Sequence, residues 1–332
     1  MRLAIDAMGG DHAPDQIVQG AWRAAERFPD LQLVLVGDAA RIRAILDDET
    51  RSNIEIVHTT EVIAADDEPV RAVRRKQDAS LTVAARMVKE GRVDGFVSAG
   101  NTGALMAAGL LVIGRVEGIQ RPALASVWPT FDGRGVLVLD VGANMDAEPA
   151  HLLQYAVMGD LYAKYVLAVD KPRIGLLNVG TEPGKGNALT KEAYSLFSQQ
   201  TFAFVGNVEA RDIMHGVCDV VVCDGFVGNV MLKLVEGVGL GMFNALKEVF
   251  LASPLSKLAA LALKPGLKRF KQKFDYSEYG GAPLLGVNGV CIKAHGSSNA
   301  RAFEMAIEQA RQFLLHGVLD QIRAGVGGDE TR

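Results

Sequence analysis

Residues 136–144 read Val-Leu-Val-Leu-Asp-Val-Gly-Ala-Asn, a short unbroken apolar run that ends in an acidic residue and a glycine turn. Near-continuous apolar strands are what a parallel sheet covered on both faces requires. Asp, Gly and Asn are the residues that make turns and begin helices. The stretch therefore predicts a buried strand that leads into a helix.

The same pattern recurs along the chain, in runs that start near residues 3, 33, 95, 174 and 220. Strands that alternate with helices favour βαβ units and a doubly wound, three-layer α/β fold. Ligands of such folds gather outside the carboxyl ends of the strands, so we expect the polar turns to share one crevice. The alternative is that each turn residue serves only as a turn former or helix cap.

The composition is that of an ordinary globular protein. Of 332 residues, 49% are hydrophobic and 22% are charged, and no linker divides them, so we expect a single domain over residues 1–332. The net charge of −4 gives no global reason to bind nucleic acid. We expect no signal peptide and, because no run of 18 apolar residues occurs, no membrane-spanning helix; the expected location is cytoplasmic.

Several common types of site are absent from the sequence. Three cysteines (Cys218, Cys223, Cys291) make no disulfide framework, and neither they nor the scattered histidines have metal-site spacing. No G-x-G-x-x-G follows a strand and no Walker A motif occurs, so no cofactor is expected. No serine elbow G-x-S-x-G occurs, and no cysteine has an obvious histidine partner, so a covalent acyl-enzyme is not predicted.

The loop at residues 178–187 suggests a small anion. It follows an expected strand and places Lys185 among glycines, whose backbone N–H groups can approach phosphate closely. The alternative is a surface loop with a solvated lysine. Asn229 lies within an expected helix after the turn at residues 224–228, where its amide is a candidate donor to a developing oxyanion. Asp140 and Asp224, at strand ends, could instead cap the next helix.

Six motifs, in order along nearly the whole chain, carry a resemblance to the PlsX phosphate acyltransferases. They read IDAMGGDHAP at residues 5–14, SAGNTGA at 98–104, DVGAN at 140–144, NVGTE with GKGN between 178 and 187, DGFVGN at 224–229 and AHGSS at 294–298. The resemblance implies a fold similar to the isocitrate and isopropylmalate dehydrogenases and the phosphotransacetylases. It also implies transfer of a long acyl group from acyl carrier protein to inorganic phosphate, giving acyl phosphate for phospholipid synthesis.

The resemblance further implies a homodimer that meets the membrane peripherally, with a contact to the downstream glycerol-3-phosphate acyltransferase. Lys185 and Asn229 correspond to the lysine and asparagine thought to act in catalysis. The remaining residues predicted to bind phosphate or substrate are Asp6, Gly9, Gly10, Ser98, Gly100, Asn101, Thr102, Asp140, Asn144, Gly180, Thr181, Glu182, Asp224 and His295.

Residues 250–275 form a basic segment that differs from the rest of the chain. Apolar residues at helical spacing, interrupted by Pro265-Gly266, predict an inserted hairpin of two short amphipathic helices. Such a hairpin can lie on an anionic membrane, dock the acidic carrier protein, or pack at a dimer interface. The residues predicted to contact membrane or carrier protein are Leu255, Leu258, Lys257, Lys264, Lys268, Arg269, Lys271 and Lys273.

Three other functions remain open on the sequence alone. A phosphotransacetylase-like enzyme that uses acyl-CoA, such as acetyl-CoA, shares fold and phosphate chemistry, and only the apolar basic hairpin argues against a small acyl group. An NAD-dependent decarboxylating dehydrogenase would need an aspartate cluster and a nucleotide site that the sequence does not offer. A non-catalytic phosphate-binding module at the membrane fits the lysine loop, but leaves the other polar strand ends unused.

Overall fold

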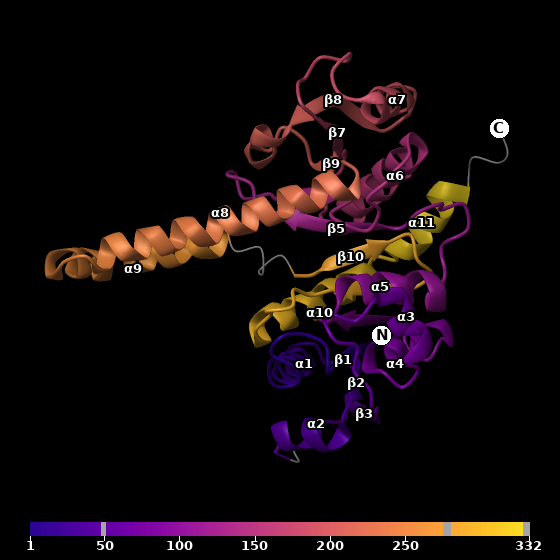
Figure 1. Cartoon of the computed structure of the whole chain (residues 1–332), viewed down its shortest axis with the longest axis vertical. Coiled ribbons are helices and arrows are strands. Elements are labelled where there is room, and N and C mark those ends of the chain that lie inside the picture. Colours follow the sequence, from indigo (N-terminus) through magenta and orange to yellow (C-terminus); the bar gives the residue numbers. More distant parts are fainter. Residues whose placement is uncertain (48–50, 275–279, 328–332) are drawn as a thin grey trace.

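The computed structural model describes residues 1–47, 51–274 and 280–327, and within these ranges eleven strands form one sheet in the order β3-β2-β1-β4-β11-β10-β5-β6-β9-β7-β8 (Figure 1). The sheet runs through the whole body of the molecule. The strands are β1 (Arg2–Asp6), β2 (Gln32–Gly37), β3 (Ile54–His58), β4 (Gly95–Ser98), β5 (Ala123–Trp128), β6 (Val136–Leu139), β7 (Arg173–Asn178), β8 (Ala203–Glu209), β9 (Val220–Val222), β10 (Ala282–Leu285) and β11 (Val290–Lys293).

The sheet consists of two parallel sets that run in opposite directions. The first set is β3, β2, β1, β4 and β11, and the second is β6, β9, β7 and β8. Between them, β10 and β5 are each antiparallel to both neighbours, which reverses the direction. The carboxyl ends of the two sets therefore point to opposite edges of the sheet, which a uniformly parallel sheet would not do.

Strand β6 shows why the apolar runs are continuous. All four of its residues are buried, with Leu137 and Leu139 in one core cluster and Val136 and Val138 in the other. Successive side chains of a strand point to opposite faces, so a strand covered on both faces needs apolar residues at every position. The three-layer arrangement predicted from this pattern is confirmed.

Helices cover both faces of the sheet. Buried side chains of α1, α6, α7, α10 and α11 belong to one core cluster, and those of α3, α4 and α5 to the other. The helices are α1 (Asp15–Arg27), α2 (Ala39–Ile45), α3 (Pro69–Arg75), α4 (Ser80–Lys89), α5 (Thr102–Ala108), η1 (Gly109–Ile113), α6 (Pro149–Tyr165), α7 (Ala188–Phe197), η2 (Ala210–His215), α8 (Gly225–Leu251), α9 (Pro254–Phe274), α10 (Ala300–Leu315) and α11 (Val318–Gly327).

The hairpin is larger than the sequence predicted. Helix α8 has 27 residues and α9 has 21, and together they project from the body of the molecule (Figure 1). Pro265 does not separate two short helices but lies inside α9. The hairpin therefore spans residues 225–274 rather than 250–275. The side chains of Lys268, Arg269, Lys271 and Lys273 lie outside the described residues.

Helix α8 is also long and apolar enough to cross a membrane, by length and composition alone. The sequence analysis expected no such helix, because it counted unbroken apolar runs rather than average hydropathy. The first turns of α8, however, pack against the sheet through Met231 and Leu232. The helix thus begins against the folded body, and its exposed apolar residues run along its whole length, from Phe226 and Val230 in its first turns to Val249 near its end.

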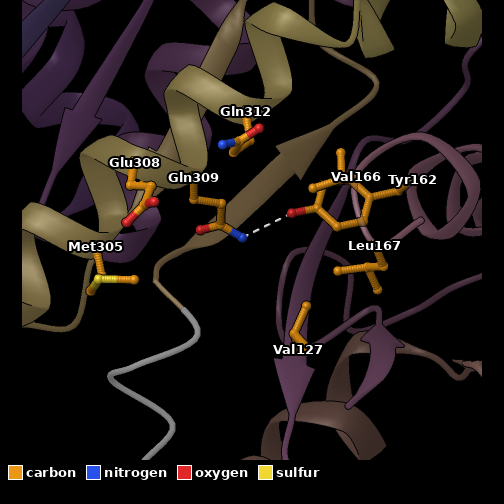
Figure 2. Close-up of a pocket in the computed structure, with 8 residues that line it drawn as sticks. All are labelled: Val127, Tyr162, Val166, Leu167, Met305, Glu308, Gln309 and Gln312. Carbon is orange, nitrogen blue, oxygen red and sulfur yellow. Dashed lines mark hydrogen bonds between the residues drawn. The ribbon is translucent and has the colours of Figure 1, made fainter. Parts of the chain in front are cut away.

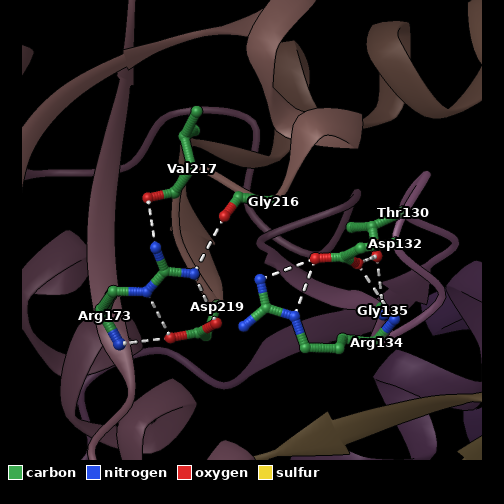
Figure 3. A network of polar contacts seen from close by, with 8 residues as sticks. All are labelled: Thr130, Asp132, Arg134, Gly135, Arg173, Gly216, Val217 and Asp219. Carbon is green, nitrogen blue, oxygen red and sulfur yellow. Dashed lines mark hydrogen bonds and ion pairs between the residues drawn. The ribbon is translucent and has the colours of Figure 1, made fainter.

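A polar network ties the amino-terminal ends of β7 and β9 together (Figure 3). The Arg173 guanidinium donates to both carboxylate oxygens of Asp219 at 2.9 Å and to the carbonyl oxygens of Gly216 and Val217. Burial acts to raise the pKa of Asp219, but the donors from Arg173 hold it below its usual value. The network fixes the parallel neighbours of the second set at the ends where the strands begin.

At the other end of the second set, α8 comes into direct contact with β6 through a glycine. A Cβ added at Gly228 would lie 1.9 Å from the carbonyl oxygen of Asp140, a main-chain atom. Only glycine permits this approach. Gly225 acts similarly, and its amide donates to the Asn144 carbonyl at 2.9 Å. These contacts set the position of the first turn of α8.

We expect Gly228→Ala to lower the free energy of unfolding by about 2 kcal/mol or more, because the methyl group must displace either α8 or the end of β6. Guanidinium titration followed by circular dichroism measures the change. Gly237→Ala is the matched control: Gly237 lies in the same helix with nothing within 4 Å of an added Cβ. The control should be neutral or slightly stabilising. Equal stability of the two variants would contradict the role given to Gly228.

Candidate active site

A cleft of about 190 Å³ lies over β5 and β10, between the start of α5 and the first turns of α8. It receives residues that follow strands of both sets, such as Gly142 after β6 and His295 after β11. The described residues that line it are Thr102, Leu124, Ser126, Val127, Val141, Gly142, Asn229, Leu232, Lys233, Glu236, Gly280, Gly281, Ala282, Lys293, Ala294, His295, Ser298 and Ala302.

Asn229 reaches this cleft from the second turn of α8. Its amide nitrogen packs against Gly142, where an added Cβ would approach it to 3.1 Å. Gly142 has a φ of 139°, a conformation that favours glycine. No described residue within hydrogen-bonding distance pairs with the Asn229 side chain, which leaves its amide available to a bound molecule. The predicted position of Asn229 at a ligand site agrees with this geometry.

Lys293 was missed by the sequence analysis. It is the last residue of β11, it is only 8% exposed, and it lines the cleft. Its ammonium donates to the carbonyl oxygen of Ala99 at 3.3 Å and to that of Ala294. Burial lowers the pKa of Lys293 to about 8. The available signal was a lysine at the end of an apolar strand, directly before the AHGSS motif.

Three ionisable side chains sit on the side of the cleft next to α8. The Lys233 ammonium pairs with the Glu236 carboxylate at 2.9 Å, and His295 Nε2 lies 3.8 Å from Glu236. His295 Nδ1 accepts from the amide of Ser297 at 3.3 Å, and Nδ1 and the Ser297 hydroxyl are 2.8 Å apart. Burial lowers the pKa of His295, which favours the neutral ring near pH 7. The predicted residue His295 therefore lines the cleft as a neutral polar group.

Asp6, predicted to bind substrate, is buried and holds Ser80 and Ser98 by hydrogen bonds, so its role in binding stays a prediction. It is 1% exposed, and its two carboxylate oxygens accept from the hydroxyls of Ser80 and Ser98, each at 2.6 Å. Burial raises its pKa, against the effect of these hydrogen bonds. A Cβ at Gly9 would lie 2.3 Å from this carboxylate, so Gly9 is required by packing around Asp6. Gly10 has a φ of 116°, which also favours glycine.

Asp140 has the corresponding place at the end of β6. Its fully buried carboxylate accepts from the main-chain amides of Leu124 at 3.0 Å and Asn144 at 2.7 Å, and from those of Gly142 and Ala143. Burial raises its pKa, and the amide donors act against this. The Asn144 side chain donates to the Pro122 carbonyl at 2.6 Å. Both residues shape the turn beside the cleft rather than line it.

Two further predicted residues cap helices. The Asn101 side chain accepts from the amide of Ala104 at 3.0 Å, and Asp224 accepts from the amide of Val227 at 3.0 Å. The contacts of Asn101 and Asp224 are thus those of helix caps, which was the alternative to ligand binding. Ser98 and Gly100 form the turn above Asp6, where the Gly100 amide donates to the Ser98 hydroxyl at 3.0 Å. Thr102, at the start of α5, lines the cleft.

The Lys185 loop lies apart from the described lining of the cleft. It follows β7, and its exposed Thr181, Glu182 and Lys185 surround the buried Gly180. The Lys185 ammonium lies 3.9 Å from the Glu182 carboxylate, and its side chain is 51% exposed. The loop is held by Asn207, whose amide donates to the Glu182 carbonyl at 2.8 Å. The contacts fit the alternative of a surface loop with a solvated lysine, and the catalytic role of Lys185 stays a prediction.

A second hollow lies between α6 and α10, lined by Val127, Tyr162, Val166, Leu167, Met305, Glu308, Gln309 and Gln312 (Figure 2). Its main feature is the Gln309 amide, which donates to the Tyr162 hydroxyl at 2.9 Å and accepts from the Gly281 amide at 2.7 Å. Gln309 thereby links α10, which covers the first set of strands, to α6, which covers the second. It also holds the start of β10, which lines the cleft.

The comparisons with known proteins identify the family of the chain. The chain matches the profile of a family described as "Fatty acid synthesis protein" over residues 1–321. A phosphate acyltransferase from Geobacillus thermodenitrificans (strain NG80-2) is 57% identical over 324 residues, which cover 98% of each chain. One from Brevibacillus brevis (strain 47 / JCM 6285 / NBRC 100599) is 58% identical over 323 residues, covering 97% of this chain and 96% of that one.

Solved structures share the fold at low sequence identity. A phosphotransacetylase from Streptococcus pyogenes has a TM-score of 0.62 at 18% identity, covering 95% of this chain and 94% of that chain. A branched-chain phosphotransacylase from Enterococcus faecalis V583 has a TM-score of 0.57 at 15% identity, covering 94% and 98%. These likenesses confirm the predicted fold class. Because the profile and the relatives span nearly the whole chain, the chain belongs to the PlsX family of phosphate acyltransferases and is an acyltransferase.

Proposed function

We propose that this acyltransferase moves a long acyl group from acyl carrier protein to inorganic phosphate, and that the acyl phosphate serves phospholipid synthesis. The observation that carries the proposal is the cleft, which is lined both by the buried Lys293 and by Asn229, whose amide has no hydrogen-bond partner among the described residues. Such donors suit an anionic acceptor and a developing oxyanion. The long apolar hairpin beside the cleft favours a donor larger than acetyl-CoA.

The reaction we propose is a direct displacement. A phosphate oxygen attacks the thioester carbonyl carbon, the new C–O bond forms, and the C–S bond breaks, so that the carrier sulfur leaves as a thiolate that takes up a proton. Phosphate is already anionic at pH 7, so a strong general base is less necessary than for an alcohol. The protein then contributes positioning and oxyanion stabilisation, for which Asn229 is the proposed donor. Lys185 is the phosphate-binding lysine that the sequence proposes.

The cysteines support a route without an acyl-enzyme. All three are buried, with 1% exposure for Cys218 and Cys291 and 4% for Cys223. Burial raises the pKa of the Cys218 thiol to about 12 and that of Cys223 well above its usual value. A buried protonated thiol is a poor nucleophile. None of the three lines the described part of the cleft.

The hairpin is the proposed contact with other macromolecules. Large apolar side chains along both helices are exposed, among them Leu234, Met242 and Val249 of α8 and Leu255 and Leu258 of α9. Contiguous exposed apolar surface marks an interface with protein or membrane. We propose that it pairs two copies in a homodimer, and that the turn between the helices contacts the membrane peripherally.

Carrier protein is proposed to dock through the basic residues of α9, since Lys257 and Lys264 are exposed and carrier protein is acidic. A peripheral location of a cytoplasmic enzyme, near the downstream glycerol-3-phosphate acyltransferase, belongs to the same proposal. An enzyme at this location would release its apolar product, the acyl phosphate, close to the lipid phase.

The first experiment compares acyl donors. We expect purified enzyme to release thiol from palmitoyl–acyl carrier protein only when inorganic phosphate is present, and to release little from acetyl-CoA. A thiol reagent follows the release, and mass spectrometry identifies acyl phosphate. Release from acetyl-CoA alone would assign the chain to a phosphotransacetylase-like reaction instead, and release without phosphate would exclude phosphate as the acceptor.

Asn229→Ala should lower kcat by roughly 10²–10³, the usual cost of losing one oxyanion donor. Asn244→Ala is the matched control, since Asn244 is an exposed residue of the same helix far along the hairpin. Lys185→Ala tests the lysine predicted from the sequence and should be folded but nearly inactive. Wild-type turnover by either active-site variant would remove that residue from the mechanism.

The double variant Leu255→Glu/Leu258→Glu should lose most of its binding to vesicles of phosphatidylglycerol and phosphatidylcholine, since both side chains are more than half exposed near the turn of the hairpin. Co-sedimentation measures the bound fraction. Leu315→Glu, an exposed leucine at the end of α10, is the control and should bind as wild type does. Undiminished sedimentation of the double variant would rule out the hairpin turn as the membrane contact.

A further inference from the structure

We propose that Lys293 binds the acceptor phosphate directly, through an N–H of its ammonium that faces the cleft. This inference rests on the proposed function only in taking inorganic phosphate as the acceptor. It assigns the phosphate-binding charge to the end of β11 in the first set of strands, whereas the sequence assigned it to the Lys185 loop after β7 in the second set.

The hydrogen bonds of Lys293 to described residues leave one of its donors unused. An ammonium has three N–H groups, and two have main-chain acceptors, the carbonyl oxygens of Ala99 and Ala294. These carbonyls hold the side chain in place but carry no net charge. Lys293 also lines the cleft, so a third donor is available to a molecule bound there.

The charge of Lys293 lacks a direct counter-ion among the described residues. Asp6 is the carboxylate that raises the pKa of Lys293 most, but both carboxylate oxygens of Asp6 accept hydrogen bonds from the hydroxyls of Ser80 and Ser98. No carboxylate of the described chain lies within 4.0 Å of its ammonium nitrogen. A buried charge without a partner is costly, and an anionic ligand removes that cost.

Lys233, the other lysine that lines the cleft, differs in both respects. Its side chain is 63% exposed and its ammonium pairs with Glu236 at 2.9 Å. Exposed ion pairs contribute little, and the pairing already offsets the charge. Of the two lysines, Lys293 is the one whose burial and free donor suit a small anion, and Asn229 lines the same cleft.

The charged groups around Lys293 set the expected pH dependence. Burial lowers its pKa to about 8, Asp6 of β1 and Asp11 act to raise the pKa, and Lys233 of α8 acts to lower it. The pKa of His295, two residues along the chain, is lowered by burial, which favours its neutral form near pH 7. Only the protonated lysine donates to phosphate with a positive charge. The contribution of Lys293 to phosphate affinity should therefore be fully present well below pH 8 and be lost as the pH rises above 8.

The experiment measures kcat and KM for phosphate and for the acyl donor in Lys293→Met and Lys293→Arg. A lost charged hydrogen bond typically costs about 1.5–3 kcal/mol, so Lys293→Met should raise the KM for phosphate about 10–100-fold. The KM for the donor should change less than about 2-fold. Lys293→Arg should recover much of the phosphate affinity and keep it above pH 8, because arginine stays charged.

Lys191→Met is the matched control, since Lys191 is an exposed residue of α7, and its kinetics should equal those of wild type. Circular dichroism and thermal unfolding verify that the variants are folded. A phosphate KM within about 2-fold of wild type in folded Lys293→Met would overturn the proposal. So would an alkaline fall in phosphate affinity that Lys293→Arg leaves unchanged.

A titration of wild type with inorganic phosphate in a calorimeter needs neither a variant nor an acyl donor. Binding at pH 7 that weakens at least several-fold at pH 9.5 supports the proposal, and equal affinity at the two pH values contradicts it. If carrier-protein thioesters prove not to be donors, this titration still tests Lys293, so the two proposals fail separately.

Discussion

The cleft depends above all on the buried carboxylate of Asp140. Its oxygens accept from the amide of Leu124 in β5 and from amides of the turn at residues 142–144, so one side chain fixes the end of β6 against its antiparallel neighbour. The carbonyl oxygen of the same residue is the surface on which Gly228 of α8 packs. A carboxylate that is this well bonded tolerates burial that would otherwise be costly. The position of Asn229 follows from these contacts.

Asp6 does for the first set of strands what Asp140 does for the second. Its carboxylate joins the hydroxyls of Ser80 and Ser98, and the glycine turns at residues 9 and 100 close around it. Each aspartate ends a strand and secures the turn that follows. Since the two sets run in opposite directions, these turns lie at opposite edges of the sheet. The cleft over β10 and β5 nevertheless receives residues that follow strands of both sets.

The sequence predicted the strands and the three layers because buried strands need apolar residues on both faces, as β6 shows. It could not predict the reversal, since β10 and β5 are as apolar as their parallel neighbours and pairing direction leaves no mark in composition. Glycine and aspartate turns predicted the region of the site but not which side chains line it, because a capping aspartate and a binding aspartate look alike. Lys293 was missed because it is distinguished by its burial beside the cleft, and a single lysine at a strand end in the sequence does not reveal burial.

Helix α8 links the cleft to the exposed apolar surface that we propose as the contact with other molecules. Asn229, Lys233 and Glu236 lie in its first turns, and its last residue, Leu251, begins the turn of the hairpin. At 1.5 Å per residue, the 27 residues extend roughly 40 Å. A membrane at the hairpin turn therefore cannot touch the cleft, so membrane contact affects the reaction through the orientation of the enzyme and the path of its product. For carrier protein docked through α9, Lys264 lies farther from the hairpin turn than Lys257, so it is nearer to the cleft that the thioester has to reach.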